Sequence, residues 1–328
     1  MSAAELLRPA PAARTDAVGM PGPCTRLTNT PRPGAAPSRL PATRLASLAQ
    51  RALLAEAEAF PKPGLVDPLG HSTHPDMDLA TFIASAIVLG PYLRRFVDVG
   101  AASRAAPPEN LLLRLRPVGV RAEQAMLHAT RGINTHRGAI FVLGLALGAC
   151  GRLQARGSLL QPELVLDEIA AISTGIVQRE LASRPTRGNS PESHGEQLFR
   201  RHGITGVRGQ AEAGFPLVRD RALPTLRAAM ACGDQESGPM AMVDTLLAIA
   251  AANDDTTTMA RGGISALAQL QDRAAAANAA GGSRTLAGRR SIRALCRWAT
   301  VEHLSLGGSA DLLSLTVLLL EIERLCSP

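Results

Sequence analysis

The residues from Glu56 to Asp78 bring together more groups capable of chemistry than any other stretch of the chain. These 23 residues include two glutamates, one lysine, three aspartates and two histidines. Carboxylates, ammonium groups and imidazoles cost free energy to desolvate unless they serve one another or a ligand. The turn Pro61-Lys62-Pro63-Gly64 stiffens the middle of the stretch. We therefore take this stretch as the nucleus of a binding or catalytic site.

Two predicted helices flank this stretch. Apolar side chains recur at helical spacing over residues 45–53, and the prolines that follow predict that this helix ends at Phe60. Either Asp76 or Asp78 can cap a second helix, which we expect to run to about Phe96. The chemically rich stretch is thus a loop held between two helices.

A second polar loop stands just before an apolar helix predicted over residues 139–150. Between Gly132 and Gly138 lie four side chains able to form hydrogen bonds, those of Asn134, Thr135, His136 and Arg137. The free N–H groups at a helix N-terminus attract anions. The loop is compatible with binding a phosphate.

An acidic pair follows another predicted helix, residues 239–252. Asp254 and Asp255 precede Arg261, and paired carboxylates followed by an arginine could hold magnesium and a phosphate together. The alternative is that these aspartates only cap the next helix.

Two more segments complete the set of candidates. Arg208 and Glu212 lie in the polar, glycine-dense segment 201–216. A glycine pair precedes Ser309, which we expect to be the N-cap of the last helix, and Asp311 would complement the dipole of that helix.

Composition and pattern predict an all-α chain with one large multi-helix domain over residues 41–328. Leu, Ala and Arg favour helix, and no run alternates as a half-buried strand would. Residues 1–40 are rich in Pro, Ala and Arg, which predicts a disordered tail. We also expect a mobile linker at residues 184–195.

The charge and cysteine patterns limit the classes of binding partner and the cellular compartment that we expect. The net charge of +7 comes almost wholly from scattered arginines, since Lys62 is the only lysine, and aromatic residues make up only 2% of the chain. Stacking on nucleic acid is therefore not expected. The longest apolar runs are too short to cross a bilayer. Five widely spaced cysteines are typical of a reducing cytoplasm, so we expect a cytoplasmic protein without nucleic-acid or membrane partners.

Five segments, taken together and in order, resemble the triphosphoribosyl-dephospho-CoA synthases over roughly residues 45–325. They are Pro61-Lys-Pro-Gly-Leu-Val-Asp67 with His74-x-Asp-Met-Asp78, Gly132-Ile-Asn-Thr-His-Arg-Gly138, the segment from Gly203 to Pro216, Asp255-Thr…Arg261-Gly-Gly263, and Gly307-Gly-Ser-Ala-Asp-Leu-Leu313. One branch of this family serves citrate lyase (CitG) and the other serves malonate decarboxylase (MdcB). The Glu-Ala-Glu and the Asp-Pro-Leu-Gly-His-Ser-Thr-His around the first segment resemble the malonate decarboxylase branch. Thr257 and Ala260 depart from the Asn and His that relatives commonly have.

The resemblance implies a glycosyl transfer between ATP and 3′-dephospho-CoA. The product would be 2′-(5″-triphosphoribosyl)-3′-dephospho-CoA, a prosthetic-group precursor, with adenine released. Such a centre passes through an oxocarbenium-like transition state, which carboxylates stabilise. The malonate decarboxylase acyl-carrier subunit or its holo-transferase would be a further partner, and Mg²⁺ would accompany the triphosphate.

The resemblance also suggests a role for each candidate residue. We expect catalytic groups at Asp76, Asp78, Glu212 and His74. Nucleotide or phosphate ligands are expected at Lys62, Asn134, His136, Arg137, Arg208, Arg261, Gly307, Gly308 and Ser309. Magnesium ligands are expected at Asp76, Asp78 and Asp255.

Other functions remain open at this point. The same reaction could serve citrate lyase. A magnesium-dependent N-glycoside hydrolase resembling the ADP-ribosylglycohydrolases would use similar residues with water as the acceptor. An isoprenoid synthase would need an Asp-Asp-x-x-Asp repeat, which Asp254-Asp255 does not complete. An inactive nucleotide-binding helical subunit would fit the altered segment at Thr257 and Ala260.

Overall fold

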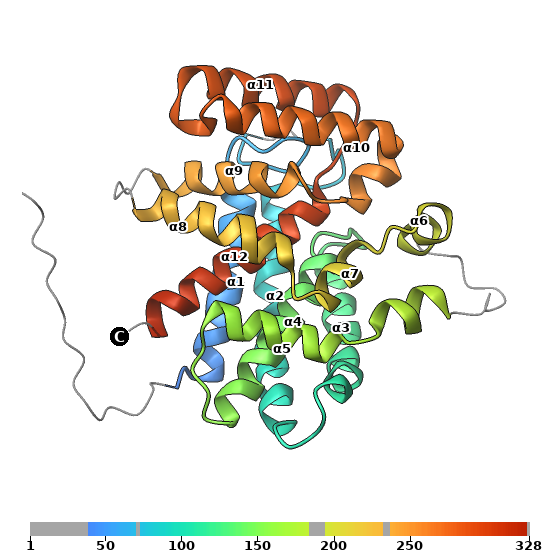
Figure 1. The fold of residues 1–328 in the computed structure, drawn as a ribbon, viewed down its shortest axis with the longest axis vertical. Helices are drawn as coiled ribbons and strands as arrows, with labels where there is room; N and C mark the ends of the chain where they lie inside the picture. The colour runs from blue at the N-terminus through green and yellow to red at the C-terminus, as the bar shows by residue number, and fades with distance from the viewer. Residues whose placement is uncertain (1–38, 70–72, 184–193, 232–236, 327–328) are drawn as a thin grey trace, which may run out of the picture. The chain divides into compact units, whose positions relative to one another are not determined.

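The computed structural model describes residues 39–69, 73–183, 194–231 and 237–326, and every regular element within these ranges is helical (Figure 1). The all-α prediction is therefore confirmed. The described residues belong to one unit of contacting residues, which spans residues 36–327. The tail predicted for residues 1–40 and the linker predicted at 184–195 lie outside the described residues, except at their edges.

The longer helices follow one another with short connections. In chain order they are α1 (Ala42–Glu58), α2 (Leu79–Ala102), α3 (Glu109–Ala129), α4 (Arg137–Ala155), α5 (Pro162–Ser173), α6 (His194–His202), α7 (Gly206–Glu212), α8 (Leu223–Ala231), α9 (Ser237–Ala250), α10 (Thr256–Ala279), α11 (Leu286–Val301) and α12 (Gly307–Cys326). Three short turns lie between them: η1 (Gln178–Ala182), η2 (Val218–Ala222) and η3 (Gly282–Arg284).

The end of α1 and the start of α2, on either side of the first polar loop, agree with the sequence predictions. Helix α1 ends at Glu58, two residues before Phe60. Helix α2 begins after Asp78, whose Oδ1 accepts a hydrogen bond from Thr81 N at 2.8 Å. Thr81 Oγ1 in turn lies 3.3 Å from Asp78 N, which completes a capping box. Of the two predicted caps, Asp78 is the one used.

Other helix boundaries depend on packing and on glycine. Helix α3 begins at Glu109, and its buried apolar face keeps the helix continuous through Pro117. Between α5 and η1 the helical backbone is interrupted, since Gly175 has φ 72°. Helix α12 begins at Gly307, so Ser309 stands in its first turn and is not its N-cap.

Helix α4 lies in the centre of the fold, and its residues from Ala139 to Leu153 are nearly all buried (Figure 1). It packs against α2 at very short range: a Cβ added to Gly100 would lie 2.0 Å from Gly148 O. Only glycines permit two helix backbones to approach so closely. Helix α12 contacts both α1 and α4, which brings the N-termini of α4 and α12 to the same side of the core.

Among the described helices, α2 and α4 are long and apolar enough to pass a length-and-composition test for membrane spans. Helix α4 extends beyond the predicted residues 139–150 at both ends. For α4, 83% of the apolar window is buried in the core, and buried core helices pass the same test.

Candidate functional site

Two pockets share a wall formed by the beginnings of α4 and α12 and by the start of α10. The polar pocket has a volume of about 350 Å³ and is lined by, among others, Glu56, Lys62, His74, Asp76, His136, Arg261 and Gly307. The wide pocket has a volume of about 480 Å³ and is lined by, among others, Phe96, Leu112, Leu115, Val120, Ile140, Phe141 and Arg208. The residues that line both are Asn134, Arg137, Gly138, Thr257 and Asp311.

The loop between α1 and α2 is held against the α11–α12 connection. Gly64 has φ 60°, and a Cβ there would lie 2.3 Å from Leu304 O. Thr73 Oγ1 lies 3.0 Å from Gly64 O and 2.8 Å from Leu304 O. Arg261 Nη1 donates to Thr73 Oγ1 at 3.2 Å and to His303 O at 3.1 Å. The polar pocket is thus closed by residues more than 180 positions apart in the sequence.

His74 connects Arg261 to the start of α12. Arg261 Nη2 donates to His74 Nδ1 at 3.0 Å, and His74 Nε2 lies 3.0 Å from Ser305 Oγ. Burial and the positive charge of Arg261 lower the pKa of His74, and Asp76 opposes this shift. A neutral ring that accepts from Arg261 carries its proton on Nε2 and donates it to Ser305. His74 therefore orients the Arg261 guanidinium.

Lys62 is buried at 2% exposure, and its ammonium group is fully used within the protein. Nζ donates to Glu56 O at 2.5 Å, Glu56 Oε1 at 2.8 Å and Ala57 O at 3.2 Å. An ammonium group has three N–H donors, so each already has a partner. The cation also lies at the C-terminal end of α1, where the helix dipole favours positive charge. The role of Lys62 as a phosphate ligand stays a prediction, since a phosphate would have to displace one of these bonds.

His136 presents an unpaired polar atom to the polar pocket. Its Nδ1 lies 2.7 Å from Ser85 Oγ, which accepts from Thr135 Oγ1 at 2.8 Å. Its Nε2 is buried and has no hydrogen-bond partner. Burial and the nearby charge of Lys62 lower the pKa of His136 to about 3, so the ring is neutral. Because Ser85 directs its own proton to Nδ1, Nε2 is left as an N–H donor available to a ligand.

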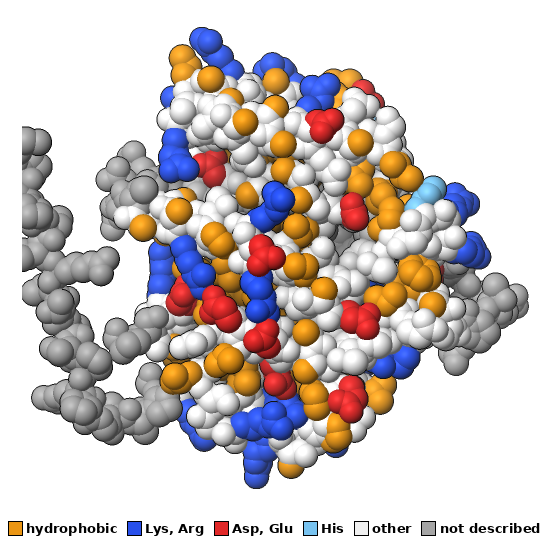
Figure 2. Space-filling view, viewed as in Figure 1, with side chains coloured by type: hydrophobic (Ala, Val, Ile, Leu, Met, Phe, Trp, Pro, Cys, Tyr) orange, Lys and Arg blue, Asp and Glu red, His pale blue; other side chains and the backbone are white. Residues whose placement is uncertain are grey.

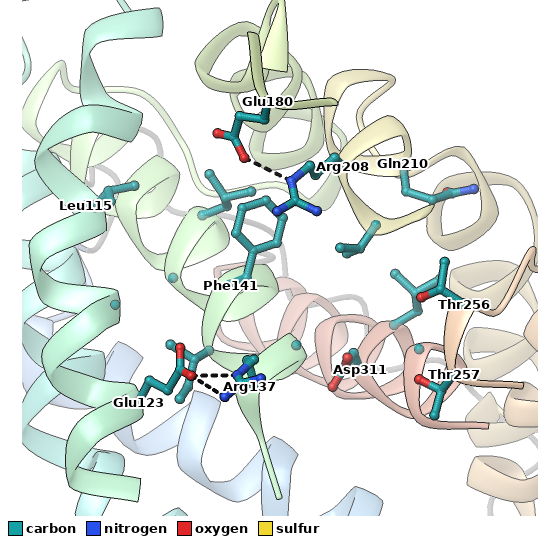
Figure 3. A pocket seen from close by; sticks show the side chains of 18 of the residues that line it. Leu115, Glu123, Arg137, Phe141, Glu180, Arg208, Gln210, Thr256, Thr257 and Asp311 are labelled. Carbon is teal, nitrogen blue, oxygen red and sulfur yellow. Dashed lines mark hydrogen bonds and ion pairs between the residues drawn. The ribbon is translucent and has the colours of Figure 1, made fainter. Parts of the chain in front are cut away.

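Arg137 and Asn134 stand on the shared wall, at the N-terminus of α4. Asn134 Oδ1 accepts from Arg137 N at 3.1 Å, which satisfies one of the free N–H groups at this helix end. The Arg137 guanidinium pairs with Glu123 of α3, with Nε 2.6 Å from Oε1 (Figure 3). Both side chains are exposed toward the pockets, so the arginine can also reach a ligand.

The wide pocket combines an apolar wall with two arginines. Phe141 projects into it, and Arg208 Nε donates to Glu180 Oε2 at 2.9 Å (Figure 3). Arg116 pairs with the same glutamate. One carboxylate between two guanidinium groups leaves a net positive charge. Gln210 Oε1 also belongs to this pocket, and it is buried without a hydrogen-bond partner.

Asp255 caps α10 and ties it to α12. Its Oδ1 accepts from Thr257 N at 3.0 Å and Thr258 N at 3.2 Å, and its Oδ2 accepts from Ser309 N at 2.7 Å and Ser309 Oγ at 2.9 Å. Burial raises the pKa of Asp255, while these hydrogen bonds lower it. Both oxygens are occupied, and so is the Ser309 hydroxyl. The geometry gives both residues structural contacts, and their predicted roles in binding metal and phosphate stay predictions.

Two predicted catalytic carboxylates line neither pocket. Asp78 is exposed and caps α2. Glu212 accepts from Gly175 N at 2.6 Å and Val177 N at 3.2 Å, so it caps the turn after α5. Each carboxylate satisfies helix-end N–H groups, so both have structural contacts, and their catalytic roles stay predictions. Of the predicted acids, only the exposed Asp76 lines the polar pocket without serving a helix end.

Asp311 is the acid that the sequence predictions did not include in the site. It lies just after the first turn of α12, on the shared wall, and points into the pocket between Arg137 and Thr257 (Figure 3). A Cβ added to Gly138 would lie 1.8 Å from its Oδ2, so the glycine makes room for the carboxylate. Burial, followed by the charges of Asp255 and Glu56, raises its pKa well above 3.8. Asp311 could have been found from the sequence, because it is an acid placed among alanine and leucine residues of a helix whose apolar side chains are expected to be buried.

A metal cage made only of protein side chains is not present in the described residues, which contain no group of three or more His, Cys, Asp or Glu arranged to hold a metal ion. The polar pocket nevertheless offers Asp76 close to cationic groups. Mg²⁺ is commonly bound by one or two carboxylates together with substrate phosphates. The residues present therefore fit a magnesium ion that is shared with a ligand.

Charged side chains of both signs are mixed on the molecular surface. On the face shown in Figure 2, Lys and Arg side chains are interspersed with Asp and Glu.

Comparisons with known proteins agree on one family. The family model described as CitG, ATP:dephospho-CoA triphosphoribosyl transferase, matches residues 42–327. A 2-(5''-triphosphoribosyl)-3'-dephosphocoenzyme-A synthase of Klebsiella pneumoniae is 42% identical over 279 residues, which cover 84% of this chain and 90% of the relative. Probable synthases of the same name from Vibrio cholerae and Salmonella choleraesuis are each 41% identical, over 85% of this chain and 88% and 91% of the relatives. No solved structure matches the chain.

Proposed function

Because the chain belongs to the family of ATP:dephospho-CoA triphosphoribosyl transferases, we propose that this enzyme joins ATP and 3′-dephospho-CoA and releases adenine. The product is 2′-(5″-triphosphoribosyl)-3′-dephospho-CoA. The bond is made between C1 of the ATP ribose and a ribose hydroxyl of dephospho-CoA.

The observation that carries this proposal is the pair of pockets with a common wall. A transferase with two large substrates needs two binding regions that meet where the bond forms. Each pocket also holds a buried polar atom without a protein partner, His136 Nε2 in one and Gln210 Oε1 in the other. Such atoms cost free energy unless a ligand or water satisfies them. Both therefore favour pockets that are filled by polar ligands.

The polar pocket suits the triphosphate of ATP. Arg261 and Arg137 supply positive charge, and His136 supplies a neutral N–H donor. The first turn of α12 adds backbone N–H groups at Gly307, and helix N-termini favour phosphate. This placement keeps four of the phosphate ligands that the sequence predicts and does not require Lys62 to leave Glu56.

The wide pocket suits dephospho-CoA. Its apolar wall around Phe141 can receive an adenine ring or the pantetheine arm, and Arg116 and Arg208 can pair with the diphosphate. The carbonyl oxygen of Gln210 can accept from an adenine amino group or a pantetheine amide.

Magnesium belongs to this proposal as an ion carried by the triphosphate. Asp76 is the pocket carboxylate best placed to share it, and Thr257 and Ser305 offer neutral oxygens nearby. Such an ion would neutralise part of the triphosphate charge.

A chromatographic assay tests the function directly. The full-length protein is incubated with ATP, Mg²⁺ and 3′-dephospho-CoA, and adenine is measured with each substrate omitted in turn. Adenine that requires both substrates is the expected result. Adenine formed without dephospho-CoA would instead indicate an N-glycoside hydrolase, and no adenine would indicate an inactive binding protein.

Phe141→Ala tests the assignment of the wide pocket. The KM for dephospho-CoA should rise by about tenfold, roughly the contribution of one buried aromatic contact, while the KM for ATP stays unchanged. Leu113→Ala is the matched control, because Leu113 is exposed on α3 and lines neither pocket. A rise confined to the KM for ATP would reverse the assignment.

We further propose that the product supplies the acyl-carrier subunit of malonate decarboxylase, with that subunit or its holo-transferase as partner, in the cytoplasm. Support comes from the Glu56-Ala-Glu58 segment and the Asp67–His74 loop, which resemble that branch, and from three described cysteines that are all free. Deletion of the gene in the source organism should abolish growth on malonate and leave growth on citrate intact. The opposite pattern would assign the enzyme to citrate lyase.

A further inference from the structure

We propose that Asp311 is the general base that removes the proton from the attacking ribose hydroxyl of dephospho-CoA. This inference rests on the proposed function, because it assumes that the two substrates meet at the shared wall.

Position is the first argument. Among the carboxylates of the described residues that line the pockets, Asp311 is the one that lines both. The transferred bond forms between one atom from each substrate, so a proton acceptor must be within reach of the place where the pockets join. Asp311 stands there, held by the backbone N–H of Ala139 and packed against Gly138.

Availability is the second argument. Each of the other acids lines one pocket only, and four of them already have protein partners. Glu56, Glu123 and Glu180 form ion pairs with Lys62, Arg137 and Arg208, and Asp255 caps α10. The remaining two, Asp76 and Asp254, are exposed. Asp311 has no such ion pair among the described interactions, so its carboxylate can receive a proton.

The surroundings also make Asp311 a stronger base than an ordinary aspartate. Its pKa is raised by burial and by two acids, Asp255 at the start of α10 and Glu56 on α1. In the polar pocket the other charged groups are Arg137 from α4, Arg261 from α10, and Lys62 and Asp76 from the first polar loop, while His136 is neutral. In the wide pocket they are Arg116 and Glu123 from α3, Glu180 from η1, Arg208 from α7 and Asp254 just before α10. General bases work best when their pKa lies near the working pH.

The proposed step balances. The hydroxyl oxygen of dephospho-CoA forms a bond to C1 of the ATP ribose as the bond from C1 to N9 of adenine breaks. The electron pair of the broken bond leaves with adenine. The hydroxyl proton passes to a carboxylate oxygen of Asp311, which then gives it to the departing adenine and returns to its ionised form. No oxidant, reductant or additional reactant is needed.

The test measures adenine release by Asp311→Asn at saturating ATP and dephospho-CoA. We expect kcat to fall by at least about 100-fold, the range of general-base contributions, while both KM values stay within about threefold of wild type. Asp272→Asn is the matched control, since Asp272 is exposed on α10 and lines neither pocket. Wild-type kcat should rise with pH as Asp311 loses its proton, and this rise should be absent from the residual activity of Asp311→Asn.

Gly138→Ala gives a second test that keeps the carboxylate. A Cβ at position 138 would lie 1.8 Å from Oδ2 and must displace it, so kcat should fall again. Circular dichroism establishes that each variant is folded, and if Asp311→Asn is not, Gly138→Ala and the wild-type pH profile decide.

An Asp311→Asn enzyme with more than about one tenth of wild-type kcat, or with only its KM values changed, would overturn the proposal. So would an unchanged pH profile. If wild-type protein forms no adenine with both substrates present, the proposed function itself fails; if wild type is active and Asp311→Asn is too, only the role of Asp311 fails.

Discussion

Replacing Lys62 with methionine should destabilise the protein before it affects any substrate. The ammonium group is 2% exposed and its carboxylate partner Glu56 is 4% exposed. In Lys62→Met, the Glu56 carboxylate loses the donor 2.8 Å from its Oε1, and the carbonyls of Glu56 and Ala57 lose theirs as well. The apolar replacement has similar length, so packing is largely kept while the charge compensation is removed.

The expected loss follows from this geometry. Removing one partner of a buried ion pair typically costs about 3–5 kcal/mol, because the remaining charge is left without compensation. For a domain of this size that loss corresponds to a fall in melting temperature on the order of 10 °C. Adding Glu56→Gln to Lys62→Met should recover part of the loss, since the double variant no longer buries an unpaired carboxylate.

Urea and thermal unfolding followed by the helical circular dichroism signal measure this effect. Arg51→Met is the matched control, because Arg51 is an exposed cation on α1 whose pair with Glu321 should contribute no more than about 1 kcal/mol. If Lys62→Met instead keeps wild-type stability and raises the KM for ATP, Lys62 binds the triphosphate as the sequence predicts, and the structural argument is refuted.

Three other predictions concern stability and the metal. Asp311→Asn should be more stable than wild type at about pH 8 and equally stable near pH 4. The pKa of Asp311 is raised in the folded protein, so wild type loses stability as the pH rises from the unfolded-state pKa through the folded-state pKa. Thermal unfolding at both pH values measures this difference. Gly100→Ala should lower the free energy of unfolding by roughly 1–3 kcal/mol or more, because its Cβ would meet Gly148 O. Gly119→Ala should raise it by about 0.5–1 kcal/mol, because Gly119 lies in open space on α3. Urea unfolding of both variants measures the two effects. Chelation with EDTA should abolish adenine release, and added Mg²⁺ should restore it; undiminished activity in EDTA would contradict the shared-ion proposal.

The helical fold could be predicted because helices carry local signals. The residues that end α1 and the cap of α2 at Asp78 are readable from prolines and a capping residue within a few positions. Helix α11 was not among the predictions, although Ile292, Leu295 and Ala299 show helical spacing. The interruption at Gly175 was not predicted either, because glycine permits a positive φ without requiring it.

The candidate site was predictable only as a set of segments. The first and second polar loops and the start of α12 do meet at the two pockets, as five segments in family order indicated. Individual roles were less predictable. A carboxylate that caps a helix and one that faces a ligand look alike in sequence, and Asp255 and Glu212 turned out to hold backbone N–H groups.

The sequence by itself determined which residue types are available, where α1 ends and α2 begins, and which family the chain resembles. The tertiary structure decided which of those groups remain available to a ligand. Lys62 is occupied by the end of α1, and Asp311 comes to the shared wall because α12 packs on α4 where Gly138 leaves room. Local patterns follow from the geometry of one helix, whereas the partner of a buried charge depends on contacts between helices that are far apart in the chain.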